Sequence, residues 1–536
     1  MTVQENSINV TGAINLAAIA QSRWQGRVSV TLDESVGLYR IEARIEDLRS
    51  VCQWICEERR YSFATLIVED AAGSAWTLTY IFYDASAPWI AIVVRPPGTL
   101  LPSMSDLAVG PSFDWHEREA EDLFGLSFEG HPRLGEFVLH EDWPEGVNPM
   151  RRSFDASRRL ASPEPHPAWH PPTIVSAPGS FAMPIGPVFA DFAESAHFVL
   201  ETVGEDVIRT IPRFFYKYRG VEKIAEGQTA DRVLLLAERF SGTAAFAHGL
   251  AFCQAVEEIC GIVLPPRAKA LRTVLAELER LRHHAATITG ICNSTALAVA
   301  AAQAGIIEEE LLRLTCEIAR HRYLFGAVVP GGLAFDLDDG QCRRLAAQCD
   351  GAASRLATLH RQLVYSSSFL DRLEEVGIVS AESARCYGLV GPIARASAGT
   401  HDIRKLRPYA AYGALEFTPA LEREGDGYAR LRVFFREAAD ASSIIRQLLG
   451  ALPPGPVRSE PFAWCAGAAL AAVEAPSGAA FHWLRLREGG IVARYRITPP
   501  AFANWHGFHL AAENFAFQDF PIILASFGLS NAECDR

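Results

Sequence analysis

The pattern of apolar residues changes once along this chain, and that change constrains its fold more than any other feature. In the first hundred residues apolar and polar side chains alternate, as in half-buried strands, whereas the second half repeats apolar residues at helical spacing. A proline-rich stretch at residues 144–180 separates the two patterns and predicts an extended linker. A chain of 536 residues is also long for one hydrophobic core. We therefore expect one domain at residues 1–143 and another at residues 181–536.

The N-terminal part contains one helical run and four strand-like runs. The helical pattern covers residues 45–58. The strand-like runs cover residues 27–32, 63–68, 76–83 and 89–94. This order predicts a small α+β domain built on a mainly antiparallel sheet.

The C-terminal part is expected to be a large, mostly α-helical domain, a helix bundle with small β-sheets, which makes the whole chain α+β in class. Two consecutive prolines, Pro265 and Pro266, precede the longest run of helical spacing and are a typical helix start. Further helices are predicted at residues 306–325 and 342–373, and strands at residues 429–435 and 491–497.

Composition and spacing argue against several functions. The formal net charge of −13 is unlike that of a general nucleic-acid binder. The eleven cysteines include no Cys-x-x-Cys pair, as is typical of reduced core thiols in a cytosolic protein. The most apolar helical run, residues 294–307, is too short to span a bilayer, so we expect no transmembrane segment. His283 and His284 lack metal-ligand spacing and are expected on a helix surface or at a partner contact.

One motif at residues 238–248 reads Glu-Arg-Phe-Ser-Gly-Thr-Ala-Ala-Phe-Ala-His. It resembles the segment in which large subunits of membrane-bound nickel–iron hydrogenases carry Glu-Arg-x-Cys-Gly-x-Cys, an apolar stretch and then Ala-His. Ser241 and Ala244 stand at the two thiolate positions. A serine hydroxyl is a poor ligand for a soft metal, and an alanine side chain is none.

The hydrogenase centre uses a second pair of thiolates, which the resemblance places near the end of the sequence given. With the closing Asp-Arg aligned, Ser530 and Glu533 occupy the two thiolate positions, and Cys534 lies one residue out of register. The resemblance therefore implies that the chain holds no nickel–iron centre, because none of the four positions supplies a thiolate.

Two longer segments resemble hydrophilic subunits of respiratory complex I. Residues 114–132 are similar to the signature of the C-type subunit, although Gly135 and Glu136 replace the paired arginines that usually follow it. From about residue 185 the chain resembles the D-type subunit. A single-chain fusion of the two resembles the large subunit of formate hydrogenlyase and of hydrogenase-4-type complexes. The blocks that match the D-type subunit include residues 218–223, 255–269, 329–333 and 390–397.

The quinone-binding residues of the complex I family are replaced as well. That family hydrogen-bonds the quinone head through a loop histidine and a tyrosine, and this chain has Phe189 and Gly242 at those positions. The acidic residue that supports the histidine is replaced at about Ser294. Phenylalanine and glycine have no side-chain proton to donate, so quinone reduction of the usual kind is not expected.

The resemblance also points to charged residues that the chain retains. Glu222 lies between Arg219 and Lys223, in a block that is near the buried site in hydrogenases. In an apolar cavity Glu222 would have a raised pKa and could relay protons. The alternative is an ion pair with Arg219 or Lys223 that fixes a loop.

Asp402 and Arg404 resemble the loop that faces the cluster-bearing partner of these families. We expect them to join Glu222 as candidate proton-relay or charge-relay residues, with structural pairing as the alternative. Arg219 and Arg239 are candidates for a place near the partner's iron–sulfur cluster, where a cation would tune its field.

The resemblance implies a large peripheral-arm subunit of a membrane-bound complex-I-like or hydrogenase-4-like oxidoreductase complex. Its role would be electron transfer from NADH or ferredoxin to quinone or another acceptor, coupled to ion translocation, at the cytoplasmic face of a bacterial inner membrane. The chain would bind no cofactor itself, and a quinone at the interface is a further candidate. Two alternatives stay open: a silent scaffold between the peripheral arm and the membrane arm, and an active hydrogenase. The expected partners are a small iron–sulfur subunit similar to the B-type subunit of complex I, a ferredoxin-like subunit and antiporter-like membrane subunits.

Overall fold

The computed structural model separates into two compact units, one of residues 1–169 with 385–388 and one of residues 170–384 with 389–536. The predicted linker at residues 144–180 falls partly outside the described part of the chain. The described residues are 10–33, 38–71, 75–84, 88–107, 110–157, 159–161, 178–189 and 194–536.

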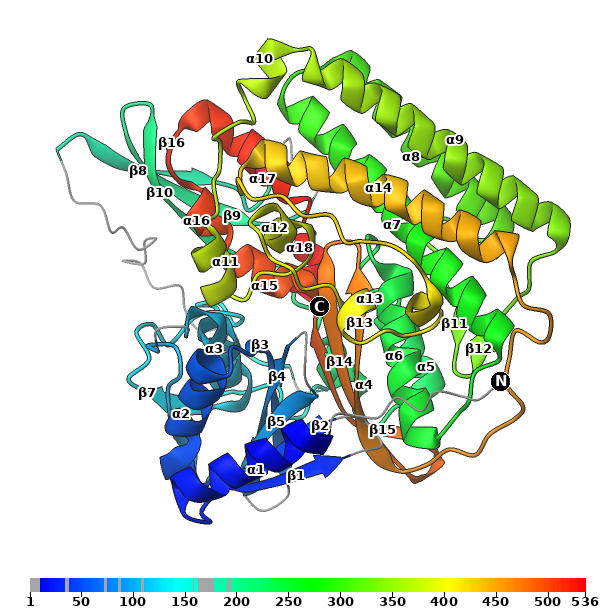
Figure 1. The fold of residues 1–536 in the computed structure, drawn as a ribbon. Helices are drawn as coiled ribbons and strands as arrows, with labels where there is room; N and C mark the ends of the chain where they lie inside the picture. Colours follow the sequence, from blue (N-terminus) through cyan, green and yellow to red (C-terminus); the bar gives the residue numbers. More distant parts are fainter. Residues whose placement is uncertain are drawn as a thin grey trace. The chain divides into compact units, whose positions relative to one another are not determined.

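The first unit is built on a five-stranded sheet with the order β1-β2-β5-β4-β3, drawn in blue in Figure 1. Every neighbouring pair is antiparallel except β2 and β5. The predicted small α+β domain with a mainly antiparallel sheet is therefore confirmed. The elements of this unit are α1 (Val10–Trp24), β1 (Ser29–Asp33), β2 (Leu38–Glu42), α2 (Ile45–Gln53) with the π-helical turn Trp54–Glu58, β3 (Ser62–Ala71), β4 (Ala75–Tyr83), β5 (Trp89–Val94), β6 (Leu100–Pro102), α3 (Pro111–Phe124) and β7 (Ser127–Glu129).

Helix α3 carries the first part of the C-type signature, and two of its residues hold the loop at residues 135–139. The guanidinium group of Arg118 donates to the carbonyl oxygens of Gly135 and Glu136, at 3.3 Å each. Oδ2 of Asp122 accepts three consecutive backbone N–H groups, those of residues 137–139, at 2.9, 2.7 and 3.0 Å. The signature thus has a local structural task in this chain, because it satisfies backbone groups that the loop leaves unpaired.

The second unit is mostly helical and carries several small sheets. Its first elements are β8 (Ser180–Ile185), β9 (His197–Val203), β10 (Asp206–Arg213), α4 (Val221–Ala225), α5 (Ala230–Ala237), α6 (Ala245–Cys260), α7 (Pro266–Ser294), α8 (Ala298–Ala319), β11 (Val328–Val329), β12 (Gly332–Leu333), α9 (Asp339–Val364), α10 (Ser367–Leu370), α11 (Ala381–Cys386), α12 (Gly391–Ala396) and α13 (Ile403–Leu406). It continues with α14 (Gly427–Gly450), β13 (Gly467–Ala475), β14 (Gly478–Arg487), β15 (Ile491–Thr498), α15 (Pro500–His506), α16 (Phe508–Ala511), β16 (Glu513–Ala516), α17 (Phe520–Phe527) and α18 (Asn531–Cys534).

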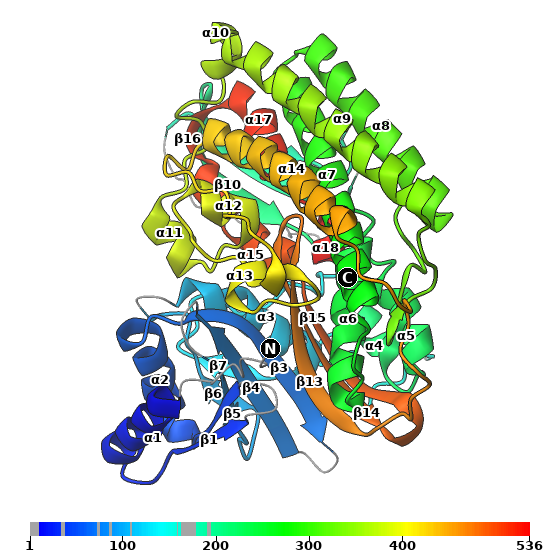
Figure 2. The same cartoon turned by 45° about the vertical axis from the view of Figure 1, so that its right-hand side comes forward.

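Long helices form one layer of this unit, and a three-stranded sheet forms another. Helix α7 packs against α8 and α14, and α9 packs against α8 and α14, as both views show (Figures 1 and 2). Helix α6 lies on the antiparallel sheet β13-β14-β15. One continuous hydrophobic core joins these helices to the sheet. The predicted helix bundle with small sheets is confirmed.

Two sequence expectations for this unit are confirmed and one is wrong. Helix α7 begins at Pro266, as the two prolines predict, and β15 coincides with the predicted strand at residues 491–497. The predicted strand at residues 429–435 instead lies in α14. Asp426 caps that helix by accepting the N–H of Ala429 at 2.7 Å, and the helix buries one face against α7 and α9. Capping and packing therefore override the strand-like alternation.

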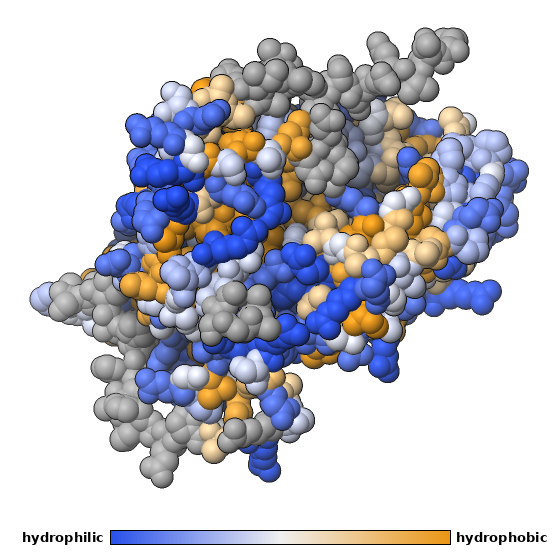
Figure 3. All heavy atoms as spheres, turned by 90° about the horizontal axis from the view of Figure 1, so that it is seen from below, coloured by the Kyte–Doolittle hydropathy of each residue, from blue (hydrophilic) through white to orange (hydrophobic). Residues whose placement is uncertain are grey.

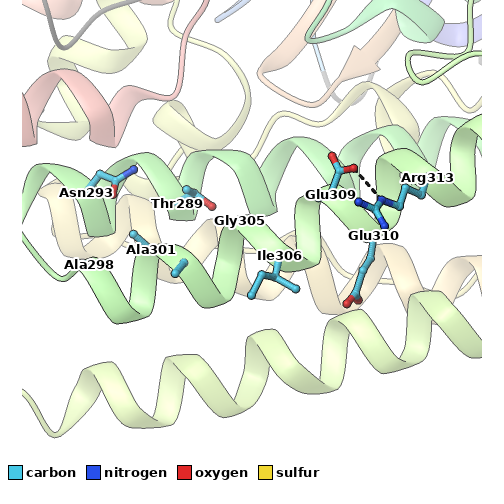
Figure 4. Close-up of a pocket in the computed structure, with 10 residues that line it drawn as sticks. Thr289, Asn293, Ala298, Ala301, Gly305, Ile306, Glu309, Glu310 and Arg313 are labelled. Atoms are coloured by element: carbon cyan, nitrogen blue, oxygen red, sulfur yellow. Dashed lines mark hydrogen bonds and ion pairs between the residues drawn. The ribbon is translucent and has the colours of Figure 1, made fainter.

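A groove opens on the surface of the long helices. It lies along α7 and α8 and has a volume of about 670 Å³ (Figure 4). Small side chains line one part, and the ion pair of Glu309 with Arg313 (2.8 Å) lies at one end. None of the site residues predicted from sequence lines it.

Hydrophobic side chains also reach the surface of the described residues in small groups. Val299 and Ile306 on α8 are exposed. On the face drawn in Figure 3, hydrophobic residues lie between hydrophilic ones. None of the described helices is both long enough and apolar enough to cross a membrane.

The role of Asp122 gives a test of the fold. Substituting Asp122→Ala leaves three N–H groups without their acceptor, so we expect the free energy of unfolding of the first unit to fall by about 2 kcal/mol. Hydrogen–deuterium exchange at the amides of residues 137–139 should accelerate in the variant. The matched control is Asp106→Ala, which removes an exposed ion pair with Arg49 (2.8 Å) and should cost under about 1 kcal/mol. Equal exchange in both variants would contradict the assignment.

Candidate functional site

The four positions that the resemblance aligns with hydrogenase thiolates lie in two buried segments of the second unit. Ser241 and Ala244 lie between α5 and α6, while Ser530 caps α18 and Glu533 lies within it. The segments meet, because Oε1 of Glu533 is 2.9 Å from Nε2 of His248 in the first turn of α6. The structure thus brings both segments to one site.

The side chains at these positions make local hydrogen bonds. Oγ of Ser241 is 3.0 Å from Oγ1 of Thr243. Oγ of Ser530 accepts the N–H of Glu533 (3.1 Å) and donates to Oε1 of Glu194 (2.8 Å). Two hydroxyls, a methyl group and a carboxylate do not fit a nickel–iron centre, which requires soft thiolate ligands. Among the described residues, no group of three or more His, Cys, Asp or Glu side chains is arranged to hold a metal ion.

His248 is the centre of a buried chain of hydrogen bonds. Its Nε2 faces Glu533, and its Nδ1 lies 2.9 Å from Nε2 of His482 on β14. Nδ1 of His482 lies 2.6 Å from the phenol oxygen of Tyr495 on β15. Burial and the nearby His248 hold the pKa of His482 well below its ordinary value, so this imidazole is neutral at physiological pH.

Two members of this chain of hydrogen bonds were not predicted from the sequence. His248 belongs to the Ala-His motif, but His482 lies 234 residues away from it and Tyr495 on the strand beyond. No spacing in the sequence identifies His482 or Tyr495 as site residues. They come together because strands β14 and β15 pair. In the sequence, the Ala-His motif was the feature that pointed to this site.

Glu222 is a buried carboxylate held by three arginines. Its Oε2 accepts from Arg494 at 3.0 Å. Its Oε1 accepts from Arg536 at 3.2 Å and from the N–H of Ile497 at 3.0 Å, and Arg496 lies 3.4 Å away. Burial acts to raise the pKa of Glu222, but the three guanidinium groups outweigh it and the pKa falls to about 2. The expected raised pKa is therefore wrong.

The partners proposed for Glu222 from sequence have other contacts. Lys223 pairs with Glu226 at 2.9 Å. The guanidinium group of Arg219 donates to the carbonyl oxygen of Ala532, and its backbone N–H donates to the carbonyl oxygen of Arg536 at 3.2 Å. Arg219 therefore binds the segment that contains α18, and its place near a partner's cluster stays a prediction.

Asp402 and Arg404 belong to a second buried group, which we call the charged cluster. Nη2 of Arg404 lies 2.7 Å from Oδ2 of Asp402, and its Nη1 lies 3.1 Å from Oε1 of Glu277. The cluster joins α7, the α12–α13 segment, α14 and β13. Structural pairing of Asp402 with Arg404 is thus observed, while a relay role stays a prediction. The members of the charged cluster are Glu277, Arg280, His284, Arg395, Asp402, Arg404, Tyr412, Glu437 and Glu474.

The charges of this cluster do not balance when every carboxyl group is ionised, because four carboxylates face three guanidinium groups. Burial acts to raise the pKa of Asp402, but Arg404 and Arg395 outweigh it and lower the pKa. Burial raises the pKa of Glu474, and the nearby Asp402 raises it further. Glu474 is therefore the carboxyl group whose protonation would balance the cluster.

Two further sequence expectations are resolved by these contacts. His283 and His284 are both buried, so their predicted surface position is wrong. Nε2 of His284 lies 2.9 Å from Oε2 of Glu437, inside the charged cluster. Arg239 pairs with Glu238, and its guanidinium group lies 5.0 Å from the ring centre of Phe325. Its predicted place near a partner's cluster stays a prediction.

Comparison with protein-family models identifies two domains in the chain. Residues 41–159 match the 30 Kd subunit of the respiratory-chain NADH dehydrogenase. Residues 306–466 and 458–536 match the 49 Kd subunit of the same enzyme. Both families therefore lie in one polypeptide, in the order that the sequence predicts.

Three curated relatives match this chain over the same share of its length. Formate hydrogenlyase subunit 5 of Escherichia coli is 31% identical over 80% of this chain and 75% of its own length. Hydrogenase-4 component G of E. coli is 29% identical over 80% of this chain and 74% of its own length. The fused C/D subunit of the NADH-quinone oxidoreductase of Acinetobacter baylyi is 28% identical over 80% of this chain and 79% of its own length.

A solved structure shares the fold. A chain of the membrane-bound sulfane sulfur reductase, described as an archaeal respiratory membrane complex, superposes with a TM-score of 0.64 at 25% identity. The match covers 67% of this chain and 99% of that one. Together these similarities show that the chain belongs to the family of fused 30 Kd-type and 49 Kd-type respiratory-chain proteins that includes formate hydrogenlyase subunit 5, hydrogenase-4 component G and the C/D fusion of NADH-quinone oxidoreductase.

Proposed function

We propose that this chain is the large peripheral-arm subunit of a membrane-bound complex-I-like or hydrogenase-4-like complex that transfers electrons without a nickel–iron centre. The observation that carries the proposal is the donor set at the family's metal position. Ser241, Ala244, Ser530 and Glu533 provide no thiolate, and Glu533 instead contacts an imidazole. The family supports an oxidoreductase complex, and the donor set argues against hydrogen chemistry at nickel.

The proposal includes the other subunits of such a complex. We expect a small iron–sulfur subunit similar to the B-type subunit of complex I, a ferredoxin-like subunit and antiporter-like membrane subunits. Electrons would pass from NADH or ferredoxin to quinone or another acceptor, coupled to ion translocation. The site would face the cytoplasmic side of a bacterial inner membrane, with Arg219 and Arg239 near the partner's cluster and any quinone at the interface.

The contacts of the three candidate relay residues, Glu222, Asp402 and Arg404, support different roles for them. Glu222 is ionised at every physiological pH, so it acts as a fixed negative charge and does not carry protons. Asp402 and Arg404 lie in the charged cluster, where one excess carboxylate makes proton binding favourable. The candidate relay therefore centres on the charged cluster.

A scaffold that does no redox chemistry is the second candidate function. It is favoured by the extent of ion pairing, since Glu222 and Asp402 are both fully engaged by arginines. Such a scaffold would couple the peripheral arm to an antiporter-like membrane arm. An electron-transfer assay of the purified complex separates the two proposals, because a scaffold complex would reduce no acceptor through this chain.

Metal analysis tests the absence of a nickel centre. The complex would be purified from its native membrane through a tag on this chain, and its metals measured by mass spectrometry. We expect iron from partner clusters and nickel far below one atom per chain. A complex containing formate hydrogenlyase subunit 5, purified in the same way, is the comparison sample. Stoichiometric nickel would overturn the argument from the four replaced positions.

The fixed charge of Glu222 is tested by stability. Lowering its pKa from 4.5 to about 2 corresponds to about 3 kcal/mol of stabilisation. Because the folded pKa is lower than the unfolded one, this contribution is present above about pH 4.5 and is lost as the pH falls toward 2. We expect Glu222→Gln to lower the free energy of unfolding by about 3–5 kcal/mol at neutral pH.

Denaturant unfolding as a function of pH measures this effect. The difference between the wild type and Glu222→Gln should shrink as the pH falls below 4.5. Glu226→Gln is the control, because it removes a nearby, more exposed pair with Lys223 and should cost under about 1 kcal/mol. The fixed-charge role would be contradicted if Glu222→Gln left the free energy of unfolding unchanged. It would also be contradicted if the difference from the wild type grew as the pH fell.

A further inference from the structure

The buried chain Glu533–His248–His482–Tyr495 has a property that structural hydrogen bonds do not require: both nitrogens of each imidazole are engaged. The three contacts are 2.9, 2.9 and 2.6 Å long, and all four side chains are buried. They come from α18, α6, β14 and β15. The side chains therefore form a continuous line of proton-binding atoms through the interior.

The donors in this line all point the same way when the carboxyl group of Glu533 is ionised. An ionised carboxylate only accepts, so Nε2 of His248 must donate to it. The Nε2–H group of neutral His482 then donates to Nδ1 of His248. Nδ1 of His482 in turn accepts from the phenol O–H of Tyr495. Every link is satisfied without a charged imidazole.

A proton can move along this line by exchange of bonds alone. The O–H bond of Tyr495 and the Nε2–H bonds of His482 and His248 break. New bonds form at Nδ1 of His482, at Nδ1 of His248 and at Oε1 of Glu533. The phenolate oxygen regains a proton from hydronium, which becomes water, so the net result is one solvent proton delivered to Glu533. No electron moves.

The carboxylate end of the line differs from an ordinary structural contact. Oε2 of Glu533 is buried and has no hydrogen-bond partner in the described part of the chain. A buried carboxylate oxygen without a hydrogen bond is costly in the interior, so this end of the line is not explained by structural pairing alone. By contrast, the capping role of α18 is filled by Ser530 and Glu194, so Glu533 is not needed for it. The carboxyl group is therefore placed at the end of the line by its contact with His248.

Aromatic rings pack against two members of the line. The ring of Phe240 lies 4.4 Å from that of His248, and the ring of Phe252 lies 5.5 Å from that of Tyr495. Burial raises the pKa of Tyr495 well above its ordinary value, and the ionised Glu222 and the thiol Cys253 act in the same direction. A phenolate is therefore unfavourable, and loss of the phenol proton must be coupled to its replacement.

We propose that Tyr495, His482, His248 and Glu533 form a proton-transfer line that delivers or removes one proton at the place where the family's fourth metal ligand would stand. The inference goes beyond the proposed function, since it concerns groups within this chain and does not depend on the electron donor or acceptor. It assigns proton chemistry to the position that has lost its metal ligand.

Nitrogen NMR of the full chain, labelled in its histidine side chains, tests this line. We expect both His248 and His482 to carry their proton on Nε2 at neutral pH. Their ring N–H groups should exchange with heavy water faster than that of His284. His284 is the matched control, because it is equally buried and its Nε2 lies 2.9 Å from the carboxylate of Glu437, but its Nδ1 has no hydrogen-bond partner among the described residues.

Two variants interrupt the line at opposite ends. In Glu533→Gln the amide oxygen still accepts from His248 but takes no proton, and in Tyr495→Phe the phenol proton is absent. We expect each variant to slow ring exchange at His248 and His482 by about tenfold or more, with His284 unchanged. If one variant fails to fold, the other carries the test. The proposal would be overturned if one histidine carried its proton on Nδ1 and the other on Nε2. It would also be overturned if ring N–H exchange at His248 and His482 were unchanged in a folded variant.

Discussion

The anchoring of residues 530–536 is the constraint on which the rest of the site depends. Three carboxylates fix this short segment: Glu194 accepts the N–H groups of residues 531 and 532 at the start of α18, Asp535 accepts those of Phe215 and Lys217, and Glu222 binds Arg536. A four-residue helix has little stability of its own. These contacts to distant parts of the unit place Glu533 against His248.

A second set of buried charges gives the helical layer its rigidity. The charged cluster links α7 with the α12–α13 segment, α14 and β13, and each of its arginines contacts at least two carboxylates. Removing one partner from such a network leaves a buried charge uncompensated and costs several kcal/mol, whereas the intact network adds little net stability. The cluster therefore fixes the geometry of the unit more than it raises its stability, and its excess carboxylate gives it a proton-binding capacity.

The sequence predicted the broad architecture because that depends on local patterns. The periodicity after Pro266 and the alternation in β15 identify their elements, and the motifs identify the family. Prediction failed where distant residues decide the outcome. The pKa of Glu222 is set by Arg494 and Arg496, 272 and 274 residues away, and no local feature reveals them. His284 was expected at the surface for the same reason, because its partner Glu437 is 153 residues away.

The two buried carboxylates Glu222 and Glu533 show how one fold separates a fixed charge from the proposed proton acceptor. Glu222 is surrounded by guanidinium groups and stays ionised, while Glu533 contacts a histidine through one oxygen and leaves the other unpaired. Environments that differ in this way assign different roles to identical groups. Burial and the ionised Glu222 disfavour a phenolate at Tyr495, so in the proposed line Tyr495 gives up its proton only as it regains one. In the proposed line, Glu533 stands where the resemblance places a hydrogenase thiolate and forms the end of a proton path.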